Sequence, residues 1–262
     1  MRKLIATLFV LALALAGGQA DAKEWKKIRI GVEGAYPPFS SIKPDGTLEG
    51  FDIDIAWALC KQMGAECDLV SQDWDGMIPA LLARKYDAII ASMSITPERK
   101  EKVAFTRKYY NTPAKFARRK GSGIEITAAG LKGKTVAVQR ATTHDNFITA
   151  EFGDTVKIKR YATQDEAYLD AAAGRIDVLL ADSMAMLDGF LNTDTGKDFE
   201  FVGPGYSDPK YFGEGAGIAI RKNNADLVEQ FNAAIDAIRA DGTYKKINDK
   251  YFDFDVYGEP TS

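Results

Sequence analysis

The sequence predicts an α/β protein with two lobes. Apolar runs typical of short strands alternate with helical segments along the chain, which is the pattern of parallel sheets with helical connections. The chain also repeats its own plan. Residues 83–92, a helix-to-strand connection, are echoed by residues 173–182, and the strand pattern of residues 27–33 is echoed at residues 134–140. Two copies of one plan indicate two lobes.

Residues 1–22 have the pattern of a secretory signal peptide. Arg2 and Lys3 precede a mostly apolar run, and residues 20–22 fit a small-x-small cleavage site. The apolar run is too short to span a bilayer, and no later stretch reaches the roughly 20 apolar residues needed. We therefore expect an exported, soluble product that begins at Lys23, with no lipid-anchoring cysteine at its start.

Composition excludes several classes of function. The chain of 262 residues has 34 basic and 37 acidic residues and a net charge of −3, without a basic run, which argues against nucleic acid as a partner. No pattern matches a phosphate-binding loop, a nucleophile triad or a zinc cluster. The single histidine, His144, cannot hold a metal alone. We expect no cofactor, no metal and a monomer.

An amphipathic helix is predicted over residues 50–63, followed by Gly64 as its stop. Cys60 lies near the end of this helix, and Cys67 begins the next predicted strand. In an oxidising compartment these two cysteines are expected to pair. Their spacing is not CxxC, so a structural disulfide is favoured over a redox-active one.

A buried strand predicted over residues 86–92 leads through a Ser-rich turn to a helix start. Thr96 suits the N-cap and Pro97 the first helical position. Such a turn is expected to aim several backbone N–H groups at one spot, where a carboxylate binds as readily as a phosphate. Arg99 adds a guanidinium that grips carboxylates with two N–H groups. The alternative is a surface helix start, with Arg99 in a solvated ion pair.

Polar residues at the carboxyl ends of the predicted strands are the first candidates for a site, because ligands of open α/β sheets bind there. A helix start at residues 142–145, after another strand, offers further free N–H groups. The strand-end residues are Glu33, Ser92, Gln139 and Asp182.

Two extended stretches rich in proline and aromatic residues, 109–115 and 206–213, are predicted to join the lobes. Two crossings make a hinge, and the cleft between the lobes is then the expected binding site. The predicted organisation is lobe 1 from residues 23–110 and 214–262, lobe 2 from residues 115–206, and hinge strands at 111–114 and 207–213.

Several motifs coincide in order and spacing with those of a known family. They are residues 50–54, 78–81, 94–99, 131–134, 173–177, 239–244 and 251–258. Together they resemble the polar amino-acid-binding proteins of ABC importers, and most closely the lysine/arginine/ornithine-binding and histidine-binding periplasmic proteins. The resemblance implies a two-lobed periplasmic binding protein fold (type II), with the ligand between the lobes and lobe 1 discontinuous in sequence. The Cys60–Cys67 pairing matches the family pattern.

The resemblance also assigns roles to the charged ends of a free amino acid. The α-carboxylate is assigned to Arg99, Ser92, Ser94 and the backbone of Thr143, and the α-ammonium to Asp182. The alternative for Asp182 is a helix cap or a surface acid. The predicted ligand-binding set is Glu33, Tyr36, Trp74, Ala91, Ser92, Ser94, Arg99, Gln139, Thr142, Thr143, His144 and Asp182.

Recognition of the ligand's side chain is assigned to two aromatic residues and an acid. Tyr36 and Trp74 match the family's pair that sandwiches the aliphatic stem, although either suits a half-buried core position. Glu33 matches the acid that meets a distal positive group. Three departures leave the ligand open: Glu33 is longer than the usual Asp, Gln139 replaces Leu, and His144 replaces Gln.

The implied function is capture of a basic amino acid by lobe closure and its delivery to the membrane permease of an ABC importer, in the periplasm. Arginine, ornithine or lysine is the expected ligand. The alternatives are an opine or histidine binder on the same fold, or a periplasmic enzyme resembling cyclohexadienyl dehydratase. Such an enzyme needs an acid–base pair, for which Glu33 and His144 are the candidates.

Overall fold

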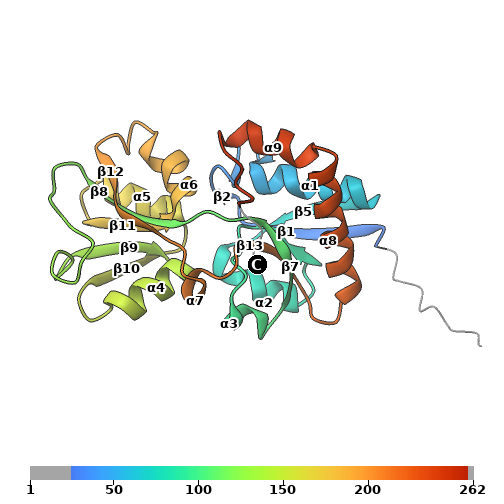
Figure 1. The fold of residues 1–262 in the computed structure, drawn as a ribbon, viewed down its shortest axis with the longest axis horizontal. Coiled ribbons are helices and arrows are strands. Elements are labelled where there is room, and N and C mark those ends of the chain that lie inside the picture. Colours follow the sequence, from blue (N-terminus) through green and yellow to red (C-terminus); the bar gives the residue numbers. More distant parts are fainter. Residues whose placement is uncertain (1–24, 259–262) are drawn as a thin grey trace, which may run out of the picture.

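Two five-stranded sheets divide the chain into two lobes, which lie side by side in Figure 1. The structure is a computed structural model that describes residues 25–258, so the predicted signal peptide lies outside the described residues. The predicted α/β two-lobed fold class is confirmed. Lobe 1 denotes the half with the first sheet and lobe 2 the half with the second; the exact lobe bounds stay a prediction.

The sheet of lobe 1 is completed by a strand that arrives last. Its strands, in spatial order, are β5 (Glu66–Ser71), β1 (Lys27–Val32), β6 (Ala88–Ile89), β13 (Ala216–Ile220) and β7 (Ala104–Tyr110). β1 runs parallel to both of its neighbours, whereas β13 pairs antiparallel with β6 and β7. Because β13 follows lobe 2 in the sequence, lobe 1 is discontinuous.

The sheet of lobe 2 repeats this mixture. Its strands are β10 (Lys157–Tyr161), β9 (Thr135–Gln139), β11 (Val178–Asp182), β8 (Ala114–Arg119) and β12 (Phe199–Tyr206). β9 is parallel to β10 and β11, and β8 is antiparallel to β11 and β12. A small antiparallel sheet in lobe 1 joins β2 (Ala35–Tyr36), β3 (Ser40–Ile42) and β4 (Leu48–Glu49).

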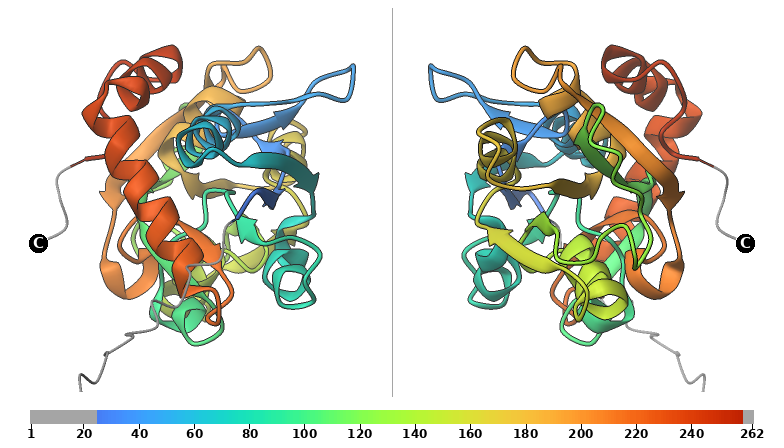
Figure 2. Two further views of the ribbon diagram at one scale, coloured as in Figure 1. Left: turned by 90° about the vertical axis from the view of Figure 1, so that its right-hand side faces the viewer. Right: turned by 90° about the vertical axis from the view of Figure 1, so that its left-hand side faces the viewer.

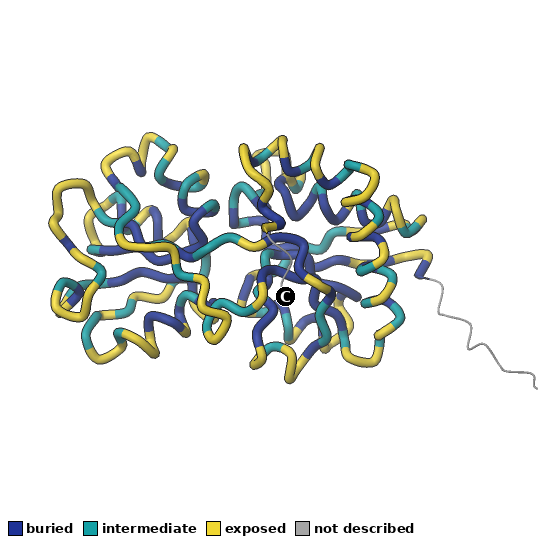
Figure 3. The backbone as a smooth tube through the Cα atoms, in the orientation of Figure 1, coloured by how far each residue is buried: buried dark blue, intermediate teal, exposed yellow. Residues whose placement is uncertain are grey.

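Helices cover both faces of each sheet, so each lobe has two apolar cores (Figures 2 and 3). Alternate side chains of a strand point to opposite faces. Val136 and Val138 of β9 face the core under α4 (Thr143–Phe152), and Ala137 faces the core under α5 (Gln164–Ala172). The helices are α1 (Phe51–Met63), α2 (Met77–Leu82), α3 (Pro97–Lys100), α4 (Thr143–Phe152), α5 (Gln164–Ala172), α6 (Ser183–Met186), α7 (Pro209–Phe212), α8 (Ala225–Ala240) and α9 (Thr243–Tyr251), with a 3₁₀ turn η1 (Trp74–Gly76) and a π turn η2 (Leu187–Leu191).

The prediction of a helix ending at Gly64 is confirmed by α1. Gly50 precedes it with φ 128°, where a Cβ would meet the Phe39 carbonyl oxygen at 2.3 Å, so only glycine fits. Gly64 ends the helix in the left-handed conformation with φ 63°. Phe51 and Leu59 lie in the core under α8.

The predicted disulfide is confirmed: Cys60 of α1 is bonded to Cys67 of β5, across a separation of seven residues. Cross-linking so short a loop removes entropy from the unfolded chain and stabilises the fold by about 2.5 kcal/mol. We expect the Cys60→Ser, Cys67→Ser double variant to melt roughly 5–10 °C lower. A thermal melt followed by circular dichroism measures this, and wild-type protein reduced with a thiol should match the variant. An unchanged Tm would contradict the prediction.

The two crossings between the lobes differ from each other. The first, residues 111–113, is a short extended link between β7 and β8, as predicted (Figure 1). The prediction of an extended second crossing is wrong, because it contains α7. Asp208 caps α7 by accepting from the Lys210 N–H at 2.9 Å, and Pro209 takes its first position. Phe212 of α7 packs on Phe147 of α4, so this crossing is anchored to lobe 2.

The strand predicted over residues 86–92 is shorter in the structure, where β6 covers two residues. Asp87 leaves the strand to pair with Arg29 and Arg221. Ser92, at the other end, has φ 53°, a left-handed conformation that no strand residue adopts. The chain therefore turns sharply at Ser92, where it enters the cleft between the lobes.

Candidate ligand-binding site

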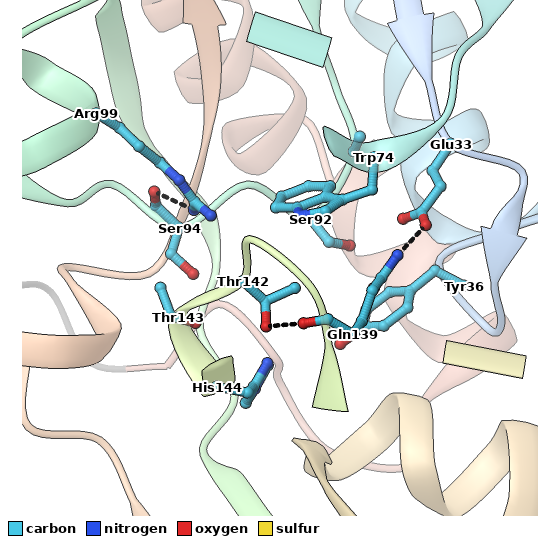
Figure 4. Close-up of a pocket in the computed structure, with 11 residues that line it drawn as sticks. Glu33, Tyr36, Trp74, Ser92, Ser94, Arg99, Gln139, Thr142, Thr143 and His144 are labelled. Carbon is cyan, nitrogen blue, oxygen red and sulfur yellow. Dashed lines mark hydrogen bonds between the residues drawn. The ribbon is translucent and has the colours of Figure 1, made fainter. Parts of the chain in front are cut away.

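A cavity of about 310 Å³ lies between the lobes, in the cleft where the sequence predicts a site (Figure 4). It is lined by Glu33, Tyr36, Trp74, Ala91, Ser92, Ser94, Arg99, Gln139, Thr142, Thr143 and His144. An adjoining cavity of about 470 Å³ shares Tyr36, Ser92 and Ser94 with it and is also lined by Asp182. The structure thus brings every residue of the predicted set to one cleft; their contacts with a ligand stay a prediction.

The cavity has two chemically different ends. Figure 4 shows Arg99, Ser94 and Thr143 at one end and Glu33 with Gln139 at the other. The indole of Trp74 lies between them. A cationic end and an acidic end, separated by an aromatic wall, suit a ligand with an anionic group at one end and a cationic group at the other.

Arg99 supplies the cationic end. Thr96 accepts a hydrogen bond from the Arg99 N–H at 3.3 Å, so the predicted N-cap is confirmed. The guanidinium donates to the Ser94 carbonyl at 3.0 Å and lies 5.1 Å from the ring centroid of Trp74. Burial lowers its pKa to about 10, which leaves it charged at neutral pH. No carboxylate of the described residues lies within 4.0 Å of it, so the solvated ion pair is not formed.

Two N–H groups of the turn before Arg99 are bonded within lobe 1, so the predicted cluster of free N–H groups there is smaller than expected. The N–H of Ser92 donates to the Tyr109 hydroxyl at 3.0 Å, and that of Ile95 donates to the Gly215 carbonyl at 2.8 Å. Pro97 has no N–H. The Ile95 N–H is used because residues 93–95 pair with the backbone of residues 215–217.

Lobe 2 supplies donors instead, at the start of α4. Thr142 caps this ten-residue helix by accepting from the Asp145 N–H at 3.2 Å. The N–H groups of Thr143 and His144 precede the first intrahelical bond, so they are left for a ligand. The helix dipole adds positive potential at this point. An anionic group placed here is held between Arg99 of lobe 1 and the α4 N-terminus of lobe 2.

Asp182 ends β11 and is both a helix cap and a wall of the cleft. Its Oδ1 accepts from the N–H groups of Met184 and Ala185 at 2.8 and 3.1 Å, and its Oδ2 accepts from the Thr112 hydroxyl of the first crossing. Burial raises its pKa to about 6. Among residues 25–258 no cation pairs with Asp182, so this carboxylate at the lobe boundary suits an ammonium group.

Glu33 forms the acidic end and is 8% exposed. The Gln139 amide, from the other lobe, donates to the Glu33 Oε1 at 2.5 Å and to the Ala162 carbonyl at 3.1 Å. Burial outweighs that hydrogen bond and raises the pKa of Glu33 to about 8. Tyr36 and Trp74 are both buried, so each serves as core and as cavity wall.

The lobes touch across the cleft at several further points. The Trp74 indole N–H donates to the Ala141 carbonyl at 3.1 Å, and Arg140 pairs with Asp75 at 2.7 Å. Together with the Glu33–Gln139 contact, these bonds define a closed arrangement of the two lobes. A ligand in the cavity is then surrounded by both lobes.

His144 lines the cavity with a half-buried neutral ring. Burial and the nearby charge of Arg99 lower its pKa to about 3. Figure 4 shows it away from Glu33, whose carboxyl is already bonded to Gln139, so the two do not form the acid–base pair of the enzyme alternative. Across residues 25–258, no group of three or more His, Cys, Asp or Glu side chains is placed to hold a metal. Nor is any helix in that range long and apolar enough to cross a membrane.

One residue that the sequence did not indicate lies behind the cavity wall and supports it through hydrogen bonds. Asp52, in the first turn of α1, is completely buried. It accepts from the Ser92 hydroxyl at 2.9 Å and from the Tyr109 hydroxyl at 2.8 Å. Its burial could not be read from the pattern, because an acid in a first helical turn is explained by the helix dipole alone.

Comparison with known proteins identifies the family. Residues 28–254 match the model of the bacterial extracellular solute-binding proteins, family 3. The chain is 53% identical to an L-arginine-binding protein of Pseudomonas aeruginosa, over 98% of this chain and 99% of the relative. It is 42% identical to the lysine/arginine/ornithine-binding periplasmic protein of Escherichia coli, over 99% of this chain and 100% of the relative.

A solved structure agrees with this. An ancestral arginine-binding protein bound to arginine superposes with a TM-score of 0.81 at 35% identity, covering 88% of this chain and 100% of the other. These relatives are named for binding a solute and not for catalysis. The two-lobed fold, the cleft between the lobes and the family match agree, and the chain belongs to the bacterial extracellular solute-binding proteins of family 3.

Proposed function

We propose that this protein binds a basic amino acid, with arginine preferred, and presents it to the permease of an ABC importer. One observation carries the proposal. Arg99, which has no carboxylate within 4.0 Å among the described residues, and Glu33, whose one side-chain partner is an amide, face the same cavity from opposite ends. An amino acid with a positive tail satisfies both. The name of the Pseudomonas relative supports arginine.

The ligand's α-carboxylate is assigned to Arg99, the Ser94 side chain and the free N–H of Thr143. Its α-ammonium is assigned to Asp182, and its tail lies beside Trp74 and points to Glu33. An opine shares the basic tail, and histidine offers a shorter one, so both belong in the test.

Ligand binding favours the closed arrangement only through contacts that the open one lacks. In this protein those contacts come from lobe 2, at Thr143 and Asp182. The ligand therefore couples to the lobe arrangement, and the permease recognises the closed form. The predicted signal peptide and the periplasmic relative support a location in the periplasm, where a monomer meets the permease.

Calorimetric titration of the mature protein with arginine, ornithine, lysine, histidine, glutamine and octopine tests the proposal. We expect the tightest binding for arginine and weaker binding for the shorter cations. Glutamine is neutral but similar in polarity, so it controls for the tail charge. Tighter binding of glutamine, or no heat with any basic ligand, would overturn the proposal.

Cation binding is expected to release a proton from Glu33. In the closed ligand-free form, burial raises the pKa of Glu33 from 4.5 to about 8, so its carboxyl is protonated at neutral pH. A cation beside it favours the ionised form and lowers that pKa. Arginine affinity should therefore rise with pH between about 5 and 8, by up to about tenfold per unit, and level off above that range.

Calorimetry in phosphate and in Tris, whose ionisation enthalpies differ, counts the released proton directly. Glu33→Gln should reduce the buffer dependence to the smaller part that Asp52 and Asp182 contribute, because their pKa values are about 7 and about 6. Glu98→Gln, which changes an exposed acid of α3, should retain the full buffer dependence. Equal heats in both buffers for the wild type would contradict the prediction.

A further inference from the structure

We propose that Asp52 acts through Ser92 to set the hydrogen-bonding polarity of the subsite that receives the ligand's α-ammonium group. This inference rests on the proposed amino-acid ligand. It makes Asp52 a positioning residue, because Asp52 lines neither cavity of the cleft, whereas Ser92 lines both.

Ser92 is held by two hydrogen bonds and has a constrained backbone. Its hydroxyl donates to Asp52 Oδ2 at 2.9 Å, and its backbone N–H donates to the Tyr109 hydroxyl at 3.0 Å. Its backbone has φ 53°, a conformation that non-glycine residues keep only where the surroundings enforce it. The turn at Ser92 is therefore fixed by groups behind the cavity wall.

The direction of these bonds follows from their partners. The Tyr109 hydroxyl has one proton, which it donates to Asp52 Oδ1 at 2.8 Å while it accepts from the Ser92 N–H. Burial raises the pKa of Asp52 to about 7, and a bound ammonium group favours its ionised form; the ionised carboxylate only accepts, so the Ser92 hydroxyl then donates to it. Both protons that Ser92 could offer a ligand are thus used inside lobe 1.

Ser92 consequently meets the cavity with the remaining lone pairs of its hydroxyl oxygen. An acceptor suits an ammonium and repels a carboxylate. Asp182, the other acid of this wall, lines the same adjoining cavity from lobe 2. We therefore reassign Ser92 from the α-carboxylate, where the family resemblance placed it, to the α-ammonium, with Asp182 opposite.

Exchanging Asp52 for asparagine tests the polarity. In Asp52→Asn the amide can donate to the Ser92 oxygen, which turns the Ser92 proton toward the cavity. The probes are arginine and 5-guanidinopentanoate, which is arginine without its α-ammonium. We expect arginine affinity to fall about 10- to 100-fold, the cost of losing a hydrogen bond to a charged group, while the affinity of 5-guanidinopentanoate changes less than about threefold.

A double-mutant cycle separates this role from a general effect of charge or packing. Ser92→Ala alone should also lower the preference for arginine over 5-guanidinopentanoate. In the Ser92→Ala background, Asp52→Asn should then have little further effect on that preference, because the residue through which it acts is gone. Asp54→Asn is the matched control, since Asp54 lies in the same turn but pairs with Lys250 and Tyr251 on the surface; it should leave both affinities unchanged.

Two results would overturn the proposal: equal losses for both probes in Asp52→Asn, or an undiminished effect of Asp52→Asn in the Ser92→Ala background. If Asp52→Asn does not fold, the Ser92→Ala preference alone decides, and an unchanged preference overturns the proposal. A wild type that binds another amino acid overturns only the proposed ligand, because that amino acid and its deaminated analogue then provide the same test.

Discussion

Replacing Arg99 with alanine should weaken arginine binding by about 30-fold to several thousand-fold, corresponding to about 2–5 kcal/mol. The ligand's carboxylate would remain enclosed by both lobes without its cation, and only the Ser94 side chain and the N–H groups of α4 would still bind it. Arg99→Lys should fall between the wild type and the alanine variant, because one ammonium cannot form the two parallel bonds of a guanidinium. Calorimetry with arginine measures both variants.

Arg107 offers a matched control for this experiment. It pairs with Asp236 on the surface of lobe 1, away from the cleft, so Arg107→Ala should bind arginine as the wild type does. Near-native affinity in Arg99→Ala would remove Arg99 from the site and, with it, the assignment of the carboxylate end.

Replacing Asp182 with asparagine should have a similar effect, about 30-fold or more on arginine affinity, because the α-ammonium loses its one acidic partner in lobe 2. Asparagine keeps an oxygen for the N–H groups of Met184 and Ala185, so the cap of α6 survives. The variant should therefore fold normally and lose binding, a combination that calorimetry and a thermal melt detect together.

The two roles of Asp182 separate when the residue is shortened further. Asp182→Ala removes the cap as well and should lower stability by about 1 kcal/mol in addition to the lost affinity. Asp208→Asn controls for a change at a helix cap, since Asp208 caps α7 in the same manner. Retained arginine affinity in Asp182→Asn would show that Asp182 is a cap alone.

Local sequence patterns were sufficient for the elements that carry the site. Thr96 and Thr142 were predicted as the starts of α3 and α4 from residue type and position alone, and both accept the expected backbone hydrogen bond. The strand ends at Glu33 and Gln139 were predicted to line one site, although no contact between them was predicted. They do meet, although 106 residues separate them. Within each lobe, parallel strands align their carboxyl ends, so the repeat indicated two such sheet edges, but only the structure shows that the two edges face each other.

Two features of the structure lay outside such patterns. The helix α7 has four residues, too few for a periodicity, although its Asp208–Pro209 start has the chemistry of a helix cap. Asp52 was overlooked for the opposite reason: the first turn of α1 already explains an acid there, and nothing local shows that it is completely buried.

The sequence by itself therefore determined the fold class, the disulfide and the types of residue that surround the cleft, because each depends on short-range pattern and composition. The tertiary structure alone decided what those residues can do. It shows which protons of Ser92 are used inside lobe 1, that Arg99 keeps its charge without a carboxylate of the described residues beside it, and that the pKa of Glu33 rises to about 8. Hydrogen-bond satisfaction and desolvation are sums over atoms from distant parts of the chain, so they exist only once the chain has folded.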